Sequence, residues 1–114
     1  MEKAIAILRL YKDTMQNLHW LNAKNYAKHL LFERLMNDVG PLLDRMVEVY
    51  LGANDRTINI EEIKYEESSD LTLREFIEKC KTDFKACFLV GVDDDMENVV
   101  SDILEMFDRH LYLC

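Results

Sequence analysis

Turn-forming residues are scarce in this chain, which has three glycines and one proline in 114 residues. All-β sandwiches and barrels need many short strands joined by Gly- and Pro-rich turns, so this composition argues against them. A hydrophobic content of 49% is also too high for a disordered chain. The length fits a single domain spanning residues 1–114. The composition therefore predicts one all-α domain.

Long apolar runs are absent as well. No stretch of about 18 uninterrupted apolar residues could span a membrane, and the first ten residues, which include Glu2, Lys3 and Arg9, lack the apolar centre of a signal peptide. We therefore expect a cytoplasmic protein without a membrane partner.

Basic residues are in deficit, with 14 Lys and Arg against 22 Asp and Glu, a formal net charge of −8. No block of basic residues stands out, and contact with phosphates is the main source of affinity for nucleic acid. The charge therefore argues against a nucleic-acid partner.

Cysteines are few and odd in number, namely Cys80, Cys87 and Cys114. On one helix Cys80 and Cys87 would lie about 10 Å apart, too far for a disulfide. We expect free, inert thiols.

Apolar periodicity predicts four helices. The first spans Glu2 to Leu21, and a short polar link from Asn22 to Asn25 should fold the second back against it. The second runs from Asn25 to Leu51 and should end at Gly52, with a kink at Pro41. One arc of its surface is apolar and should face the core; its members are Leu31, Phe32, Leu35, Met36, Val39, Leu42, Leu43, Met46 and Tyr50.

An acidic connector from Ala53 to Asp70 follows, and Ile58, Ile60 and Ile63 could attach it to the bundle. A capping box of Thr72 and Glu75 should begin a third helix that ends near Gly91. The Asp93–Asp95 triplet should open a fourth helix, because acidic side chains favour the positive helix end. The pattern predicts an up-and-down four-helix bundle.

A second stripe on the second helix is rich in metal-ligand residues. With His29 at 0° on a helical wheel, Glu33 falls at about 40°, Asp44 at about 60° and Glu48 at about 100°. These residues lie apart from the apolar arc and share their stripe with Gly40. Such a mixed surface indicates a contact face.

The stripe is symmetric about position 38.5, which is the midpoint of both 29/48 and 33/44. Glu33 and Asp44 lie about 16 Å apart along one helix, so they cannot bind the same ion within one chain. If two copies of the helix cross antiparallel, with Gly40 near the crossing, His29 and Glu33 of one chain face Glu48 and Asp44 of the other.

His19 should lie level with His29 across the turn between the helices, and Trp20 should pack in the interface with the partner. The resulting site would hold two imidazoles and three carboxylates, a set that suits iron, manganese or zinc. Purely structural roles for these residues stay open as alternatives to metal binding. The i, i+4 spacings are ordinary on a helix, and Asp44 could pair with a nearby basic residue. His19 could interact with helix-end carbonyls.

The stretch from Leu18 to Gly52 resembles the ferroxidase segment of the Dps family, the ferritin-like miniferritins. That segment has a His-Trp pair closing its first helix, then a His, an acid four residues later, and an Asp and a Glu at plus fifteen and plus nineteen. His19-Trp20, His29, Glu33, Asp44 and Glu48 follow this order, although Glu33 stands where Asp is typical. Short phage-encoded Dps-like proteins show a similar pattern.

The resemblance implies a ferritin-like bundle in which His19, His29 and Glu33 of one chain and Asp44 and Glu48 of its mate bind iron between subunits. It implies oxidation of Fe(II), and iron storage with peroxide protection if a dodecameric cage forms. Helices three and four are short for such a cage, and the Lys-rich tail that some members use to bind DNA is absent. The alternatives are a non-catalytic assembly protein that retains the bundle and its dimer interface, and static zinc or manganese binding.

Overall fold

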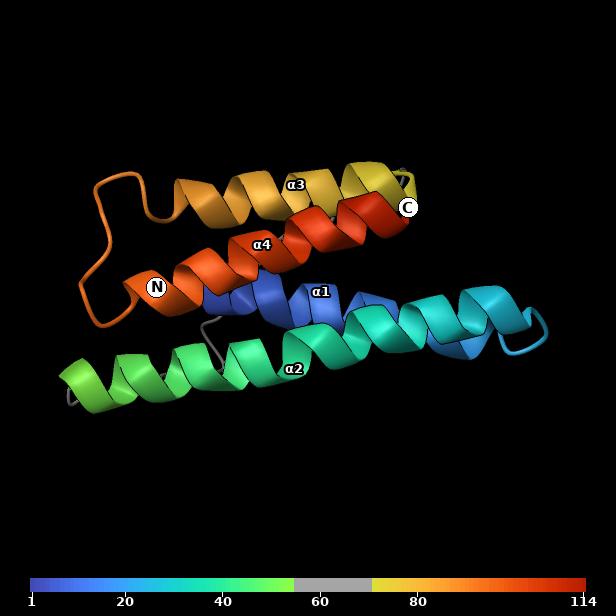
Figure 1. Cartoon of the computed structure of the whole chain (residues 1–114), viewed down its shortest axis with the longest axis horizontal. Coiled ribbons are helices and arrows are strands. Elements are labelled where there is room, and N and C mark those ends of the chain that lie inside the picture. Colours follow the sequence, from blue (N-terminus) through green and yellow to red (C-terminus); the bar gives the residue numbers. More distant parts are fainter. Residues whose placement is uncertain (55–70) are drawn as a thin grey trace.

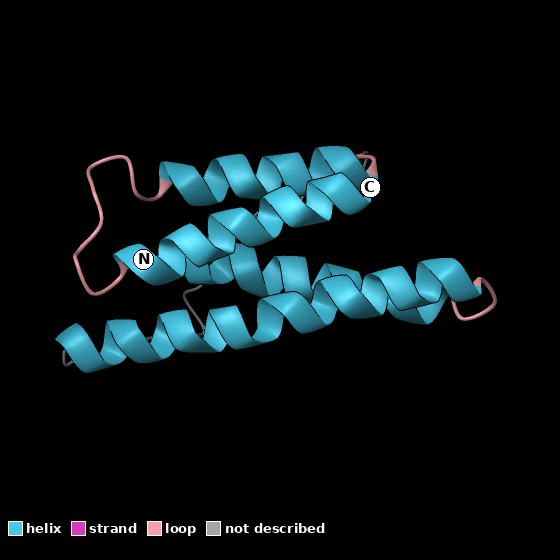
Figure 2. Ribbon diagram, in the orientation of Figure 1, coloured by secondary structure: helices cyan, strands magenta, loops and turns pink. Residues whose placement is uncertain are grey.

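The computed structural model describes residues 1–54 and 71–114 and contains four helices in this part of the chain. They are α1 (Glu2–Leu21), α2 (Tyr26–Asn54), α3 (Leu73–Ala86) and α4 (Glu97–Leu113). Figure 2 shows helices and loops, and no strand in the described residues. The prediction of an all-helical bundle is confirmed at this level. The predicted attachment of Ile58, Ile60 and Ile63 to the bundle lies outside the described residues.

The helices form a bundle in which α1 packs on α2 and α3, and α4 packs on the same two helices. Along the longest axis in Figure 1, α1 and α4 run one way while α2 and α3 run the other. Neighbouring helices are therefore antiparallel, but the two successive helices α2 and α3 run in the same direction. The alternation expected of a simple up-and-down bundle is broken at the connection between them.

Helix boundaries follow local chemistry. The N-cap of α3 is Thr72, whose hydroxyl oxygen accepts a bond from the Glu75 backbone N–H at 3.2 Å, as the capping box predicted. The Asp93–Asp95 triplet does not open α4: Met96 is the N-cap without a side-chain bond, and Glu97 is the acidic residue of the first turn.

The C-terminal ends of α2 and α3, which were predicted at Gly52 and near Gly91, also differ from expectation. Helix α2 continues through Pro41 and past Gly52 to Asn54, while α3 stops at Ala86, before Gly91. Gly91 has a φ of +119°, which favours glycine, whereas Gly52 is not among the described glycines with positive φ. A glycine ends a helix only where the backbone leaves the helical region.

The core is one continuous apolar cluster contributed by all four helices. In α2 the buried members are Phe32, Leu35, Val39, Met46 and Tyr50, while the rest of the predicted arc is partly buried against them. The apolar arc was therefore predicted correctly, and it orients the metal-ligand stripe away from the core. None of the three cysteines forms a disulfide; Cys80 is buried, Cys87 half-buried and Cys114 exposed.

None of the helices that the structure describes combines the length and the apolar content that a membrane crossing requires.

Candidate metal centre

The link between α1 and α2 is short and capped at both ends. Asn22 follows the last residue of α1, and both its backbone N–H and its side-chain amide donate to the carbonyl of Leu18, at 3.1 and 2.8 Å. Asn25 precedes α2, and its side-chain oxygen accepts a bond from the Lys28 N–H at 3.2 Å. This turn brings the end of α1 and the start of α2 side by side (Figure 1).

His19 and His29 hydrogen-bond to each other's backbone across the helical hairpin that α1 and α2 form. The Nδ1 of His19 lies 3.0 Å from the carbonyl oxygen of His29, and the Nδ1 of His29 lies 2.9 Å from the carbonyl oxygen of His19. The two rings stack with their centroids 3.8 Å apart. Because a carbonyl oxygen can only accept a hydrogen bond, each Nδ1 must carry the proton. In the neutral form of the ring the lone pair is then on Nε2.

Glu33 completes a three-residue cluster on the surface of α2. One ligand atom from each of His19, His29 and Glu33 lies within 4.8 Å of the others, and all three side chains are partly buried. Metal-binding histidines usually donate their second ring N–H to a carbonyl or carboxylate, and the reciprocal bonds of His19 and His29 supply this. The cluster therefore has the donor types of a mixed nitrogen and oxygen metal site.

Asp44 and Glu48 have exposed side chains further along α2. The rise of the helix places Asp44 about 16 Å from Glu33, so one chain does not bring these carboxylates to the histidine cluster. Within the described residues Asp44 has no ion pair, whereas its neighbour Arg45 pairs with Asp102 of α4 at 2.6 Å. The structure brings together three of the five predicted ligands and leaves the other two facing outward.

Gly40 lies at the seam between α1 and α2. A Cβ added there would sit 3.9 Å from Cε of Lys12, an ordinary contact. Lys12 of the same chain therefore lies next to Gly40.

Four apolar side chains around the hairpin are unusually exposed. We call them the hairpin patch: Trp20 at 61%, Leu21 at 81%, Tyr26 at 76% and Leu30 at 42%. They are close neighbours in sequence of His19 and His29, at the end of α1 and the start of α2. Exposed apolar surface of this kind often marks an interaction site.

A second polar constellation, which the sequence patterns did not predict, lies in the core. The Tyr11 hydroxyl lies 2.6 Å from Nδ1 of His110, and Nε2 of His110 lies 2.9 Å from a carboxylate oxygen of Asp38. Tyr11 and His110 are fully buried. Position 110 follows Ile103, Met106 and Phe107 at helical spacing, so the apolar period of α4 could have placed this histidine in the core.

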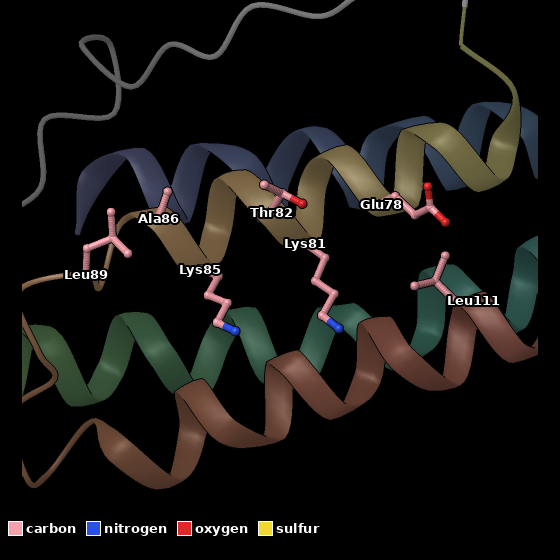
Figure 3. A pocket seen from close by; sticks show the side chains of 7 residues that line it. All are labelled: Glu78, Lys81, Thr82, Lys85, Ala86, Leu89 and Leu111. Atoms are coloured by element: carbon pink, nitrogen blue, oxygen red, sulfur yellow. The ribbon is translucent and has the colours of Figure 1, made fainter.

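A pocket of about 630 Å³ lies on the other helix pair, α3 and α4 (Figure 3). Lys81 and Lys85 extend from α3 toward α4, and Lys81 forms an ion pair with Asp108. The remaining lining is Glu78, Thr82, Ala86, Leu89 and Leu111. This lining contains no histidine and a single carboxylate, so the pocket does not have the donors of a transition-metal site.

Comparison with protein families gives a match over residues 19–114 to a family described as a family of unknown function, DUF5856. The chain belongs to the DUF5856 family. The matched DUF5856 region contains all five predicted ligands, beginning at His19, but not Tyr11. No curated protein and no solved structure matches the chain.

Proposed function

We propose that the protein binds Fe(II) at sites shared between two copies of the chain and oxidises it. The observation that carries this proposal is the reciprocal pair of hydrogen bonds between His19 and His29, which engages Nδ1 of each ring and leaves Nε2 for a ligand, in a cluster with the Glu33 carboxylate. Ligands held in one tautomer and one orientation before the ion arrives lose little freedom when it binds.

The donor set favours Fe(II), with manganese and zinc as competitors. Two imidazoles and one carboxylate from one chain occupy part of a coordination sphere and leave positions for further oxygen ligands and for an oxidant. Zinc is also satisfied by these three donors.

A second copy would supply the missing oxygens. Asp44 and Glu48 are exposed and lie out of reach of their own chain's cluster, but they mirror His29 and Glu33 about the middle of α2. A twofold axis across α2 would place them on the partner's cluster and create two identical sites. The hairpin patch offers apolar surface for such a contact.

The direction of the helices supports a ferritin-like arrangement. Helices α2 and α3 run parallel, so the end of α2 and the start of α3 lie at opposite ends of the bundle (Figure 1). A four-helix bundle with one long crossover connection is the topology of ferritin-like proteins.

In the proposed reaction each Fe(II) gives up one electron. Two Fe(II) ions reduce one hydrogen peroxide, which takes up two protons and leaves as two waters. The carboxylates stabilise the higher charge of Fe(III), since oxygen donors suit the harder ion. Detoxification of peroxide and storage of iron would follow if the dimers assemble into a closed shell, such as a dodecamer.

The test is anaerobic titration with Fe(II), followed by peroxide, with the ferric absorbance as readout. We expect saturation at one or two ions per chain and a stoichiometric rise in absorbance. The Asp44→Ala/Glu48→Ala variant should lose the rise. The matched control Asp94→Ala/Glu97→Ala removes two exposed acids outside the stripe and should retain it.

The hairpin patch favours a second candidate, a non-catalytic assembly protein that uses the same dimer surface. Under this alternative the protein still dimerises, but it neither saturates with Fe(II) nor yields the ferric absorbance. Trp20→Ser should then reduce the molecular mass measured in solution. Neither the wild type nor Asp44→Ala/Glu48→Ala should bind Fe(II).

A further inference from the structure

We infer that Tyr11 is a one-electron donor whose phenolic proton passes to His110 when it is oxidised. The inference rests on a hydrogen-bonded chain in the core, from the Tyr11 hydroxyl through both ring nitrogens of His110 to the carboxylate of Asp38. Nothing in the proposed iron chemistry uses these three residues.

The direction of each bond follows from the donors available. The Asp38 carboxylate only accepts, so Nε2 of His110 carries the proton that lies between them. In the neutral ring Nδ1 is then an acceptor, and the Tyr11 hydroxyl donates to it at 2.6 Å. A base is therefore already in contact with the proton that a phenol loses on oxidation.

Burial removes the other routes for that proton. Tyr11 is fully buried, and burial, more than the nearby charge of Asp38, raises the pKa of its hydroxyl far above the usual value. The phenolate is thus not the form that is oxidised. Water does not reach the hydroxyl, so His110 is the acceptor that the structure provides.

The positive charge that His110 gains with the proton is stabilised by the Asp38 carboxylate. Burial lowers the pKa of His110, and the hydrogen bond and charge of Asp38 oppose this shift. The ring is therefore neutral at neutral pH, and its Nδ1 can accept a proton. When it takes the proton, the imidazolium and the Asp38 carboxylate form an ion pair at 2.9 Å, and Asp38, whose side chain is 33% exposed, connects the pair to solvent.

The surroundings of Tyr11 would protect the oxidised ring. Phe76 stacks on it with centroids 5.9 Å apart, and Phe107 meets it edge-on at 5.1 Å. Tyr26 and Tyr112, by contrast, are 76% and 89% exposed. A radical on Tyr11 should therefore persist longer than one on either exposed tyrosine.

The step balances as follows. The O–H bond of Tyr11 breaks, an N–H bond forms at Nδ1 of His110, and one electron reduces a one-electron oxidant. Peroxide activated by a metal is an oxidant of this class. Where the proposed site holds a single Fe(II), Tyr11 would supply the second of the two electrons that peroxide takes. Tyr11 lies eight residues from His19, about 12 Å along α1.

The decisive experiment uses the metal-free full chain with chelator present, so that failure of iron binding does not affect it. A ruthenium tris-bipyridine complex, oxidised by light and persulfate, serves as the one-electron oxidant, and electron paramagnetic resonance of frozen samples detects radicals. We expect a persistent tyrosyl signal in the wild type and in the control Tyr112→Phe, and its loss in Tyr11→Phe. An undiminished signal in Tyr11→Phe would overturn the assignment.

Two further variants test the role of the base. His110→Gln keeps a hydrogen-bond acceptor but cannot take the proton, and it should lower the yield of the persistent signal at least tenfold. If that variant fails to fold, Asp38→Asn serves instead, because it keeps an acceptor for Nε2–H and removes only the charge that stabilises the imidazolium. We expect at least a threefold loss of signal. Wild-type yield in the folded variant would overturn proton transfer to His110.

Discussion

Two histidine sites in the same bundle have opposite environments. At the hairpin, His19 and His29 are partly buried and each uses one ring nitrogen, leaving the other for a ligand. In the core, His110 is fully buried and both of its nitrogens are engaged, by Tyr11 and by Asp38. The comparison shows that the number of satisfied ring nitrogens, and not the presence of a carboxylate nearby, separates a candidate metal site from an internal network.

The core network also links three helices of the bundle. Tyr11 lies on α1 and His110 on α4, which are diagonal in the bundle, and Asp38 lies on α2. Removing the histidine leaves a cavity and a buried hydroxyl without its partner.

The largest expected effect is therefore on stability. His110→Ala should lower the free energy of unfolding by about 3–5 kcal/mol, the sum of a cavity and an unsatisfied polar group. Denaturation with urea, followed by circular dichroism, measures it. Tyr11→Phe, which removes only the hydroxyl, should cost about 1–2 kcal/mol. A loss below 1 kcal/mol in His110→Ala would show that the network contributes little.

The next effect is on metal affinity and should be confined to the hairpin. His29→Ala should weaken binding of Co(II), a spectroscopic probe for such sites, by about 10–100-fold, or roughly 1.4–2.7 kcal/mol. Titration with Co(II), followed by visible absorbance, gives the dissociation constants of the wild type and of the variant. His110→Gln is the control and should bind Co(II) like the wild type; equal losses in the two variants would remove the distinction between the sites.

The dependence of stability on pH should come in part from the core. Burial lowers the pKa of His110 in the folded protein, with Asp38 opposing the shift. The unfolded chain therefore binds the proton at higher pH than the folded chain does. His110 thus costs no stability above the unfolded pKa of about 6.5, and stability falls as the pH drops below it, by up to about 1.4 kcal/mol per pH unit. Urea denaturation between pH 7.5 and 5 should show a shallower slope for His110→Gln, and identical slopes would contradict this account.

The smallest effect concerns the hairpin brace in the absence of metal. His19→Ala removes one reciprocal bond and one stacked ring at a partly exposed position. We expect a loss of less than about 1 kcal/mol, because a neutral hydrogen bond accessible to water contributes little net stability. The change in melting temperature measures it, and a loss as large as that of His110→Ala would mean that the brace is mainly structural.

The fold was largely predictable because it follows from periodicity. The apolar arc of α2 and the limits of α1 were predicted correctly, as was the capping of α3 by Thr72. The end of α2 was not, because Gly52 keeps helical backbone, and neither was the common direction of α2 and α3, which the pattern of a single helix does not encode.

The candidate site was predictable only in part. Helical spacing placed Glu33 one turn after His29, and the short link placed His19 level with both. The reciprocal use of backbone carbonyls was not foreseeable, since it depends on how the two helices are rotated against each other. The His110 network was not predictable from helical spacing, because its hydrogen-bonded pairs are 72 and 99 residues apart in sequence.

Complementation between two inactive variants tests the shared site most directly. His29→Ala/Glu33→Ala lacks one half of each site and Asp44→Ala/Glu48→Ala lacks the other, so neither alone should oxidise Fe(II). After the two are unfolded and refolded together, half of the dimers should be mixed, and each mixed dimer should hold one intact site out of two. The account predicts recovery of about one quarter of wild-type Fe(II) oxidation. No recovery from the well-folded mixture, or full activity of Asp44→Ala/Glu48→Ala by itself, would contradict it.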